Sequence, residues 1–357
     1  MRRTPLNDLH ATAGARFAPI DGWSIVTDFG DVDREYAALD RGAGLLDLSF
    51  RAKIRLAGPD RASFLHNMVT NDIRALRPGQ GCNAAKLTLQ GKMEGGLRIR
   101  CTADALWADV DPGAAAKILE SLRKHLIMED ACIDDVTDDW ALLALQGPQS
   151  APALAVMGVD VTPLAAHLQH QDAMIAGVPV TVARCDHAGS VGFDLWVPAA
   201  GAAAVWQTCL QAGEVQPVGL AALDIRRIEA GLPWFGAEIT GEQLPLEAGL
   251  EAGWISYTKG CYLGQETISR LHHLGHVNRT LCGLCFDANA APPPPGAVIQ
   301  SSEKRLGIVT SSTRSPRLGK PVALGYIHRD FAAPGTPVTV DDRGMHLRAE
   351  VRGLPFE

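Results

Sequence analysis

Helical periodicity stops near residue 280, and this change constrains the fold more than any other feature of the chain. Short apolar stretches separated by turns follow it, namely TLCGLCFD, GAVIQ, LGIVTSS, ALGYIH and TPVTVDDRGMHLRAEVRG. The last of these indicates a hairpin around DDRG, and APPPPG (291–296) indicates a stiff surface turn. Strands without helices are typical of a small barrel or sandwich. We therefore predict an all-β C-terminal domain over residues 276–357.

The chain before this point mixes helical and strand patterns, which predicts an α+β architecture. Residues 51–140 form one such unit, with a strand at 53–58 and a helix at 114–127. Beyond it, DWALLALQG (139–147) indicates a buried strand. Helices are expected at 199–212 and 218–230, and Gly231 is placed to end the second of them in a left-handed conformation.

Composition excludes several classes of protein. With 357 residues, of which 46% are hydrophobic and 20% charged, the chain is long enough for two or three folded domains. A net charge of −7 disfavours binding to nucleic acid, which depends on neutralising phosphates. No apolar run is long enough to span a membrane, and MRRTPLNDLH lacks the apolar core of a signal peptide. Eight scattered cysteines suit a reducing compartment, so we expect a cytoplasmic protein.

The stretch TKGCYLGQETISR (258–270) raises the question of a functional thiol. GWISYT before it indicates a strand and YLGQETISRL a helix, so Cys261 is expected near a helix N-terminus. Both this position and the charge of Lys259 would increase the thiolate fraction. Gln265 is placed to cap the helix or to hold a polar group of a ligand. The alternative is that Cys261 is a small buried residue of no chemical role.

Two motifs that suggest metal ligands have poor spacing for that purpose. In HHLGH, His272 and His276 stand four residues apart, but Gly275 interrupts the helix between them. In CGLC (282–285), cysteines three apart on a strand point to opposite faces. We therefore expect no resident metal ion.

The stretch RRIEAGLPWFGAEI (226–239) indicates a binding site for a flat ring. Arg227 offers a fork of donors for carboxylates, Trp234 offers a stacking surface, and Glu229 lies between them. This combination suits a heteroaromatic ring that carries a glutamate tail. A surface ion pair beside a core aromatic residue is an equally good interpretation of these residues alone.

Three stretches resemble a known superfamily. LPLEAGLEAGWISYTKGCYLGQETISRLHHLGHVNRTL (244–281) resembles the signature of the YgfZ-type folate-binding proteins, which are relatives of the glycine-cleavage T-protein, an aminomethyltransferase. RIEAGLPWFGAEI (227–239) is similar to both branches, and the opening TPLNDLHATAGARFAPIDGW is similar to the T-protein. The resemblance covers most of the chain.

The resemblance implies a three-domain cloverleaf with two α+β domains, the second inserted in the first, and a final β-barrel. We therefore expect a folate-binding domain from residues 1–50 and 141–275, an inserted domain at 51–140 and a barrel at 276–357. It implies tetrahydrofolate, or a derivative of it, in a central channel, with Arg227 touching the folate. It also implies that Cys261 is the functional thiol of an accessory protein that assembles or repairs iron–sulfur proteins, which would be its partners.

The chain departs from the T-protein at two acids. The T-protein has an Asp-Asp pair where this chain has Glu94 and then Gly95 in GKMEGGL. It also has an acid that holds the pterin where this chain has Ser190 in GSVGFD, so we expect a lower pterin affinity unless another acid, such as the nearby Asp194 or Glu229, substitutes. Three hypotheses remain: the folate-binding accessory protein, a tetrahydrofolate-dependent aminomethyltransferase or demethylase, and a non-catalytic scaffold.

Overall fold

The chain passes through its first body twice. The computed structural model describes residues 1–301 and 304–356, and it contains a six-stranded sheet in the order β11-β12-β13-β10-β4-β14. β4 comes from the start of the chain, whereas its neighbours β10 and β14 come from beyond residue 139. The strands of this first body are β1 (Arg2–Arg3), β2 (Arg16–Ile20), β3 (Trp23–Asp28), β4 (Ala43–Asp47), β10 (Trp140–Gln146), β11 (His170–Ile175), β12 (Val178–Arg184), β13 (Gly192–Pro198) and β14 (Val215–Pro217).

Helices cover this sheet because their apolar faces pack against its strands. Trp206 and Val205 of one helix lie in the same buried cluster as Leu143 and Leu195 of the sheet. The helices are α1 (Asn7–Thr12), α2 (Val32–Arg41), α5 (Ser150–Val156), the short 3₁₀ helix η1 (Ala199–Gly201), α6 (Ala202–Gln211) and α7 (Leu220–Ala230). α7 ends at Gly231, whose φ of 71° is the left-handed conformation expected of a glycine at a helix end.

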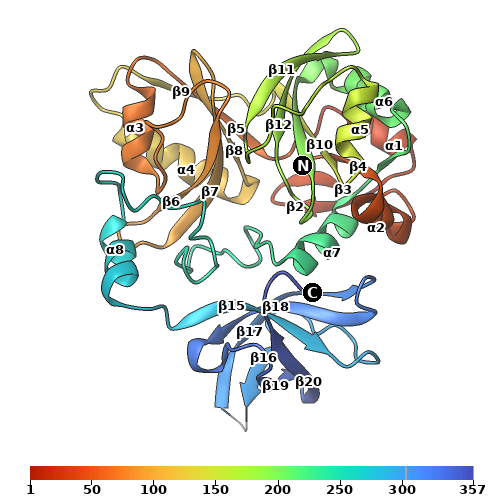
Figure 1. Cartoon of the computed structure of the whole chain (residues 1–357), viewed down its shortest axis with the longest axis vertical. Coiled ribbons are helices and arrows are strands. Elements are labelled where there is room, and N and C mark those ends of the chain that lie inside the picture. Colours follow the sequence, from red (N-terminus) through yellow and green to blue (C-terminus); the bar gives the residue numbers. More distant parts are fainter. Residues whose placement is uncertain (302–303, 357) are drawn as a thin grey trace.

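The second body is inserted between β4 and β10. Its five-stranded sheet has the order β6-β7-β8-β5-β9, and all of its strand pairs are antiparallel. Its elements are β5 (Ala52–Ala57), α3 (Arg61–Met68), β6 (Gly81–Leu87), β7 (Met93–Cys101), β8 (Ala105–Val110), α4 (Pro112–His125) and β9 (Cys132–Asp135). The first and second bodies lie side by side above the C-terminal body (Figure 1).

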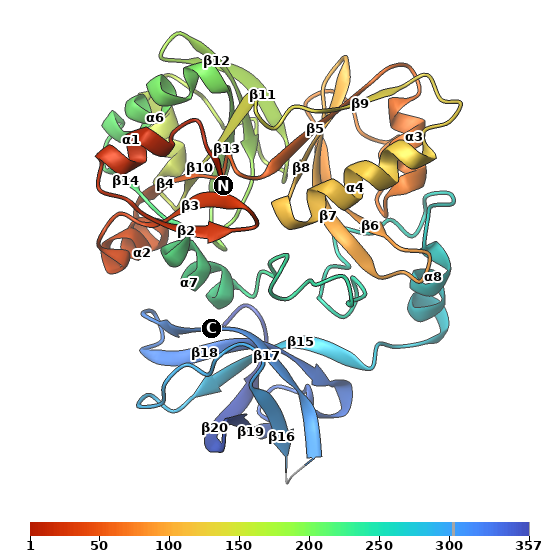
Figure 2. The same ribbon diagram turned by 180° about the vertical axis from the view of Figure 1, so that it is seen from behind.

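The C-terminal body is a closed six-stranded barrel in the order β15-β18-β17-β16-β19-β20. Its elements are β15 (Arg279–Phe286), β16 (Val298–Ser301), β17 (Lys304–Ser315), β18 (Lys320–His328), the 3₁₀ helix η2 (Arg329–Phe331), β19 (Pro337–Asp342) and β20 (Met345–Arg352). The view from behind shows the same three lobes, with α7 directed toward the barrel (Figure 2). The predicted fold, with two α+β bodies, one inserted in the other, and a terminal barrel, is confirmed.

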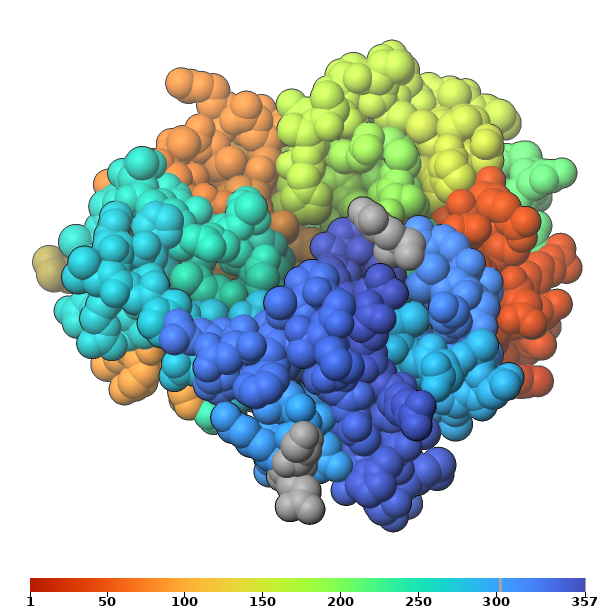
Figure 3. Space-filling view, turned by 60° about the horizontal axis from the view of Figure 1, so that its bottom comes forward, coloured from red at the N-terminus to blue at the C-terminus, as the bar shows by residue number. Residues whose placement is uncertain are grey.

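Residues 232–275 connect the three bodies. They are irregular up to α8 (Gln265–Leu274), which lies beside the second body (Figure 1). Ile239 and Ile268 of this segment share a buried cluster with Leu87 of the second body and Leu324 of the barrel. In the space-filling view the segment lies on the surface between the barrel and the second body (Figure 3). The bodies are therefore held together by one shared apolar core.

One predicted element is wrong. GWISYT (253–258) forms turns and bends instead of a strand. Trp254 and Ile255 pack against the shared core as isolated side chains, which needs no strand pairing. Cys261 therefore follows an irregular segment, and Gly264 begins the helix three residues after it. We keep the boundaries 1–50, 51–140, 141–275 and 276–357 as a proposed division of the chain.

No helix within residues 1–301 and 304–356 is both long enough and apolar enough to cross a membrane.

Candidate functional site

A cavity of about 290 Å³ lies where the first body, the second body and the connecting segment meet. Its lining combines charged side chains with apolar and aromatic ones, as in binding sites for small molecules. The residues that line it are Arg51, Asn83, Gly96, Arg98, Asp111, His167, Asp186, His187, Arg227, Leu232, Pro233, Trp234, Phe235, Ile239, Leu250 and Trp254. A second cavity of about 430 Å³ adjoins it and shares Arg227, Trp234 and Phe235.

The cations contributed by the second body are already neutralised. Arg51 donates hydrogen bonds to Asp109 and Asp111, and Arg98 donates to Asp109 over 3.0 Å. Burial alone would raise the pKa of Asp109, but Arg51 and Arg98 lower it to about 2. These four side chains therefore form a charge-balanced wall that has no net attraction for an anion.

Arg227 lies on α7 at the boundary between the two cavities. It is 4% exposed and donates to Asp224 (2.6 Å), Glu238 (2.8 Å) and Ser311 (2.8 Å). Trp234 stands beside it, with the guanidinium carbon 6.0 Å from the ring centroid. The structure therefore brings two of the predicted folate-binding residues to the cavity. It also shows that Arg227 joins α7 to the barrel, a role the sequence did not indicate.

Asp186 is the carboxylate of the cavity lining that has no cationic partner among the described residues. It follows β12, and its Oδ1 accepts hydrogen bonds from the backbone N–H groups of Ala188 (2.8 Å) and Ser190 (3.0 Å). The other lining carboxylate, Asp111, is paired with Arg51. Asp186 is thus fixed in orientation by its own loop while one oxygen stays available to a ligand.

The loop from residue 185 to 191 is held in place by a buried side chain of β10. The amide of Gln146 donates to Cys185 O (3.0 Å) and accepts from His187 N (2.9 Å), so it clamps the backbone on both sides of Asp186. Sequence reasoning missed Asp186 and His187. The available signal was a run of Cys, Asp and His at the end of a strand, next to the position where the resemblance led us to expect an acid.

Ser190 occupies the position of the missing acid. Its Oγ is buried and has no hydrogen-bond partner among the described residues. Its backbone N–H, however, binds the Asp186 carboxylate. An acid is therefore present in this loop, four residues earlier in the sequence than the resemblance led us to expect.

Gly95 and Gly96, which follow Glu94 in GKMEGGL, are both packed too closely to accept a side chain unless a neighbour moves. A Cβ on Gly96 would lie 2.9 Å from the ring of Trp254, and one on Gly95 would lie 2.7 Å from Ile118. Glu94, the predicted replacement, pairs instead with Lys86 (3.1 Å) and Lys117 (3.6 Å) and does not line the cavity. A contact between Glu94 and a ligand stays a prediction without support from the geometry.

Glu229 also lies away from the cavity lining. It is 1% exposed and accepts hydrogen bonds from Tyr36, Arg226 (2.9 Å) and Ser315. All of its bonding capacity is used in joining α7 to α2 and to the barrel. Its predicted role in binding folate therefore also stays untested and has no support from its surroundings.

Lys259, Cys261 and Gln265 lie in a different region of the molecule. The ammonium of Lys259 donates to the carbonyl oxygens of His66, Val69 (2.6 Å) and Asn71 (2.9 Å) at the end of α3, and burial lowers its pKa to about 8. Lys259 and Gln265 line a surface cavity of about 490 Å³ that shares no residue with the central one. Cys261 is exposed and lines neither cavity, so a role for it beside a folate pocket remains a prediction.

Comparison with known proteins decides the family. Residues 6–256 match the GCVT N-terminal domain, and residues 279–356 match the glycine cleavage T-protein C-terminal barrel domain. The chain belongs to the glycine cleavage T-protein family. An aminomethyltransferase of Saccharopolyspora erythraea is 31% identical over 99% of this chain and 98% of its own length. One from Shouchella clausii is 32% identical over 99% of this chain and 97% of its own length.

A solved structure agrees with these relatives. The crystal structure of glycine cleavage system aminomethyltransferase T from Bartonella henselae superposes with a TM-score of 0.89 and 28% identity, over 100% of this chain and 98% of that one. Membership in the T-protein family confirms the superfamily that the sequence resembled. These relatives are named aminomethyltransferases, and their names do not support the YgfZ-type branch.

Proposed function

We propose that this protein binds tetrahydrofolate in the central cavity and transfers a one-carbon unit to or from it, as an aminomethyltransferase or demethylase. Full-length similarity to aminomethyltransferases supports this reaction class. The prediction of tetrahydrofolate as the cofactor rests on the same family membership together with the earlier resemblance. Trp234 and Phe235 between the two cavities offer flat surfaces for the ring system.

Asp186 is the observation that carries the proposal. The pteridine ring presents an amino group and a ring N–H side by side, and such a donor pair needs a carboxylate acceptor. Every other charged group of the lining has a partner of opposite charge or is a histidine. Asp186 is oriented by two backbone N–H groups and has an oxygen to offer. It would therefore receive the donor edge of the pteridine in place of the acid missing at Ser190.

Calorimetric titration with tetrahydrofolate tests this assignment. Asp186→Asn keeps the size of the side chain but removes the charge, and we expect the affinity to fall by about 10- to 100-fold, as for a lost hydrogen bond to a charged group. Affinity for p-aminobenzoylglutamate, which lacks the pteridine, should stay unchanged. Asp172→Asn on β11, whose exposed carboxylate accepts from Thr181 and does not line the cavity, is the matched control. Equal tetrahydrofolate affinity in wild type and Asp186→Asn would refute the assignment.

A folate-binding accessory protein for iron–sulfur proteins is the second candidate. It is favoured by one observation: Ile118, Ala114 and Trp254 occupy the space in which side chains on Gly95 and Gly96 would lie, and Glu94 does not line the cavity. This stretch therefore offers the cavity no carboxylate to support transfer. The exposed thiol of Cys261 would then act on the client protein. Formation of methylenetetrahydrofolate from a methylamine donor separates the two. Turnover that survives Cys261→Ala favours the transferase, whereas folate binding without turnover favours the accessory protein.

A non-catalytic scaffold is the third possibility. It predicts neither heat of binding nor a thermal shift at high tetrahydrofolate concentration.

Complementation of a strain that lacks the YgfZ-type protein, using wild-type and Cys261→Ser genes, tests the accessory role directly. Rescue by both genes would exclude the thiol from that role.

A further inference from the structure

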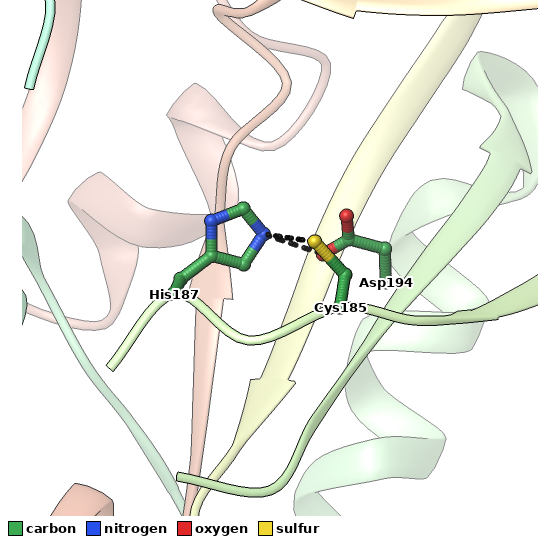
Figure 4. A group of neighbouring side chains, drawn as sticks. All are labelled: Cys185, His187 and Asp194. Atoms are coloured by element: carbon green, nitrogen blue, oxygen red, sulfur yellow. Dashed lines mark hydrogen bonds and ion pairs between the residues drawn. The ribbon is translucent and has the colours of Figure 1, made fainter. Parts of the chain in front are cut away.

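Three chemically different ligand atoms converge beneath the cavity wall. Cys185 Sγ, His187 Nε2 and Asp194 Oδ1 all lie within 4.8 Å of one another (Figure 4). All three residues are buried, with exposed fractions of 0%, 4% and 2%. Cys185 follows β12, His187 lies in the loop, and Asp194 is on β13, so one hairpin supplies the whole set.

Both partners of His187 face the same ring nitrogen. Nε2 lies 2.8 Å from Asp194 Oδ1 and 3.5 Å from Cys185 Sγ. A relay of the Cys-His-Asp kind needs the thiol and the carboxylate on opposite nitrogens of the ring, and this cluster does not have that arrangement. A single N–H on Nε2 can point at only one of the two partners, so the thiol at 3.5 Å gains little from a hydrogen bond.

The separations suit a small divalent ion. Bonds of about 2.3 Å to sulfur and about 2.0 Å to nitrogen, at tetrahedral angles, place those two atoms about 3.5 Å apart. The nitrogen and the carboxylate oxygen would lie about 3.3 Å apart in the same geometry, so this pair must open by about 0.5 Å. Thiolate, imidazole and carboxylate are all ligands that zinc accepts.

We infer that Cys185, His187 and Asp194 form a binding site for a zinc-like transition-metal ion. Gln146 clamps the backbone of Cys185 and His187, so two of the ligands are held in place before any ion binds. Three protein ligands leave a fourth position for a water molecule. A bound ion would hold Cys185 and His187 in place, and with them the intervening Asp186. The metal site would in this way stabilise one wall of the central cavity.

The charges around the cluster act in two directions. Arg98 and Arg100 are its cationic neighbours and oppose a divalent ion. Asp109, which accepts from Arg98 over 3.0 Å, reduces that opposition. Asp109 and Asp194 therefore partly offset the two arginines around the site.

Metal analysis and cobalt substitution of the whole chain test the inference. We expect about one equivalent of zinc in protein purified without chelator. After chelation, Co²⁺ should produce a thiolate-to-cobalt charge-transfer band that saturates at one equivalent. In Cys185→Ser the band should vanish and the affinity should fall at least about tenfold, because the thiolate ligand is lost. Cys209→Ser on α6 removes an equally buried thiol from the same body and should change neither result.

The opposite results would overturn it. Absence of both zinc and the cobalt band would show that the cluster is held by hydrogen bonds alone, and a band that survives Cys185→Ser would place the metal elsewhere. The cobalt band should persist in Cys261→Ser, and its loss there would place the metal at the exposed thiol. If Cys185→Ser fails to fold, X-ray absorption of the wild-type cobalt protein decides, because the inference requires one sulfur in the first coordination sphere. None of these measurements depends on folate, so they can fail while the proposed function stands.

Discussion

Two regions of this molecule hold side chains suited to binding or chemistry, and they differ in what surrounds them. In the cavity wall at residues 185–194, Cys185, His187 and Asp194 are buried, and a clamped loop presents Asp186 and His187 to the central cavity. The thiol segment at residues 257–275 lies on the surface beside the second body, and its Cys261 is exposed. A motif of unusual residues marks the second region, whereas only the fold reveals the first.

Residues that are close in sequence do not always interact in the folded chain. Lys259 stands two residues from Cys261, yet its ammonium is committed to three carbonyl oxygens of the second body. Proximity in sequence therefore does not bring a charge to a thiol. In the cavity wall, by contrast, residues from β12, its following loop and β13 meet because the hairpin folds them together.

Arg227→Met should give the largest effect, on the cavity side. Its loss leaves Glu238, which is 0% exposed, without its cationic partner. Breaking a buried pair in this way costs about 3–5 kcal/mol, which urea unfolding measures. Adding Glu238→Gln should recover part of the loss, because it removes the unpaired charge. A loss of unfolding free energy below about 1 kcal/mol would show that the surroundings of Glu238 rearrange to accommodate its charge. Arg348→Met on the exposed face of β20 serves as control.

Lys259→Met should cost about 2 kcal/mol, since it removes a charged donor from three carbonyl groups. The pH dependence has a definite sign. Burial lowers the pKa of Lys259 to about 8, below the value of about 10.4 for an unfolded chain. Between these values the unfolded chain binds more protons, so the stability of wild type relative to Lys259→Met should rise with pH. Unfolding curves at pH 7, 8, 9 and 10 measure this difference, and a fall over that interval would contradict it.

The sequence predicted the architecture because periodicity is a local property. The loss of helical spacing near residue 280 marks the barrel, and the glycine at 231 marks the end of α7. GWISYT (253–258) failed because its apolar side chains pack singly into a core shared by three bodies, and no local pattern encodes that.

The candidate site was predicted only in part, because only those of its residues that are close in sequence form a recognisable pattern. Arg227 and Trp234 lie close in sequence and meet at the cavity. Glu229 and Glu94 looked equally suitable in sequence, but each is paired with cations that the fold brings from elsewhere. Asp186 was overlooked because its importance comes from the absence of such a partner, and only the assembled cavity shows this.

Gly96→Ala should have a smaller effect on the cavity side. Its Cβ would approach the ring of Trp254 to 2.9 Å, and overpacking of this kind costs about 1–3 kcal/mol. Trp254→Leu should relieve most of the cost in the double variant, and the coupling between the two changes measures the contact. Additive effects would show that Trp254 moves aside easily. In that case a carboxylate could be accommodated at this wall, and the objection to transfer chemistry would weaken.

Cys261→Ser should have the smallest effect on stability and the clearest effect on reactivity. Substitution of an exposed side chain usually changes the free energy of unfolding by less than about 0.5 kcal/mol, and Cys261 is exposed. Cys132 and Cys261 are the exposed thiols among the eight, so a thiol reagent should modify two groups rapidly in wild type and one in Cys261→Ser. Cys132→Ser is the matched control, leaving Cys261 as the fast-reacting group. If Cys261 reacts no faster than the buried Cys209, the surface segment must close over it, and the contrast between the two regions would disappear.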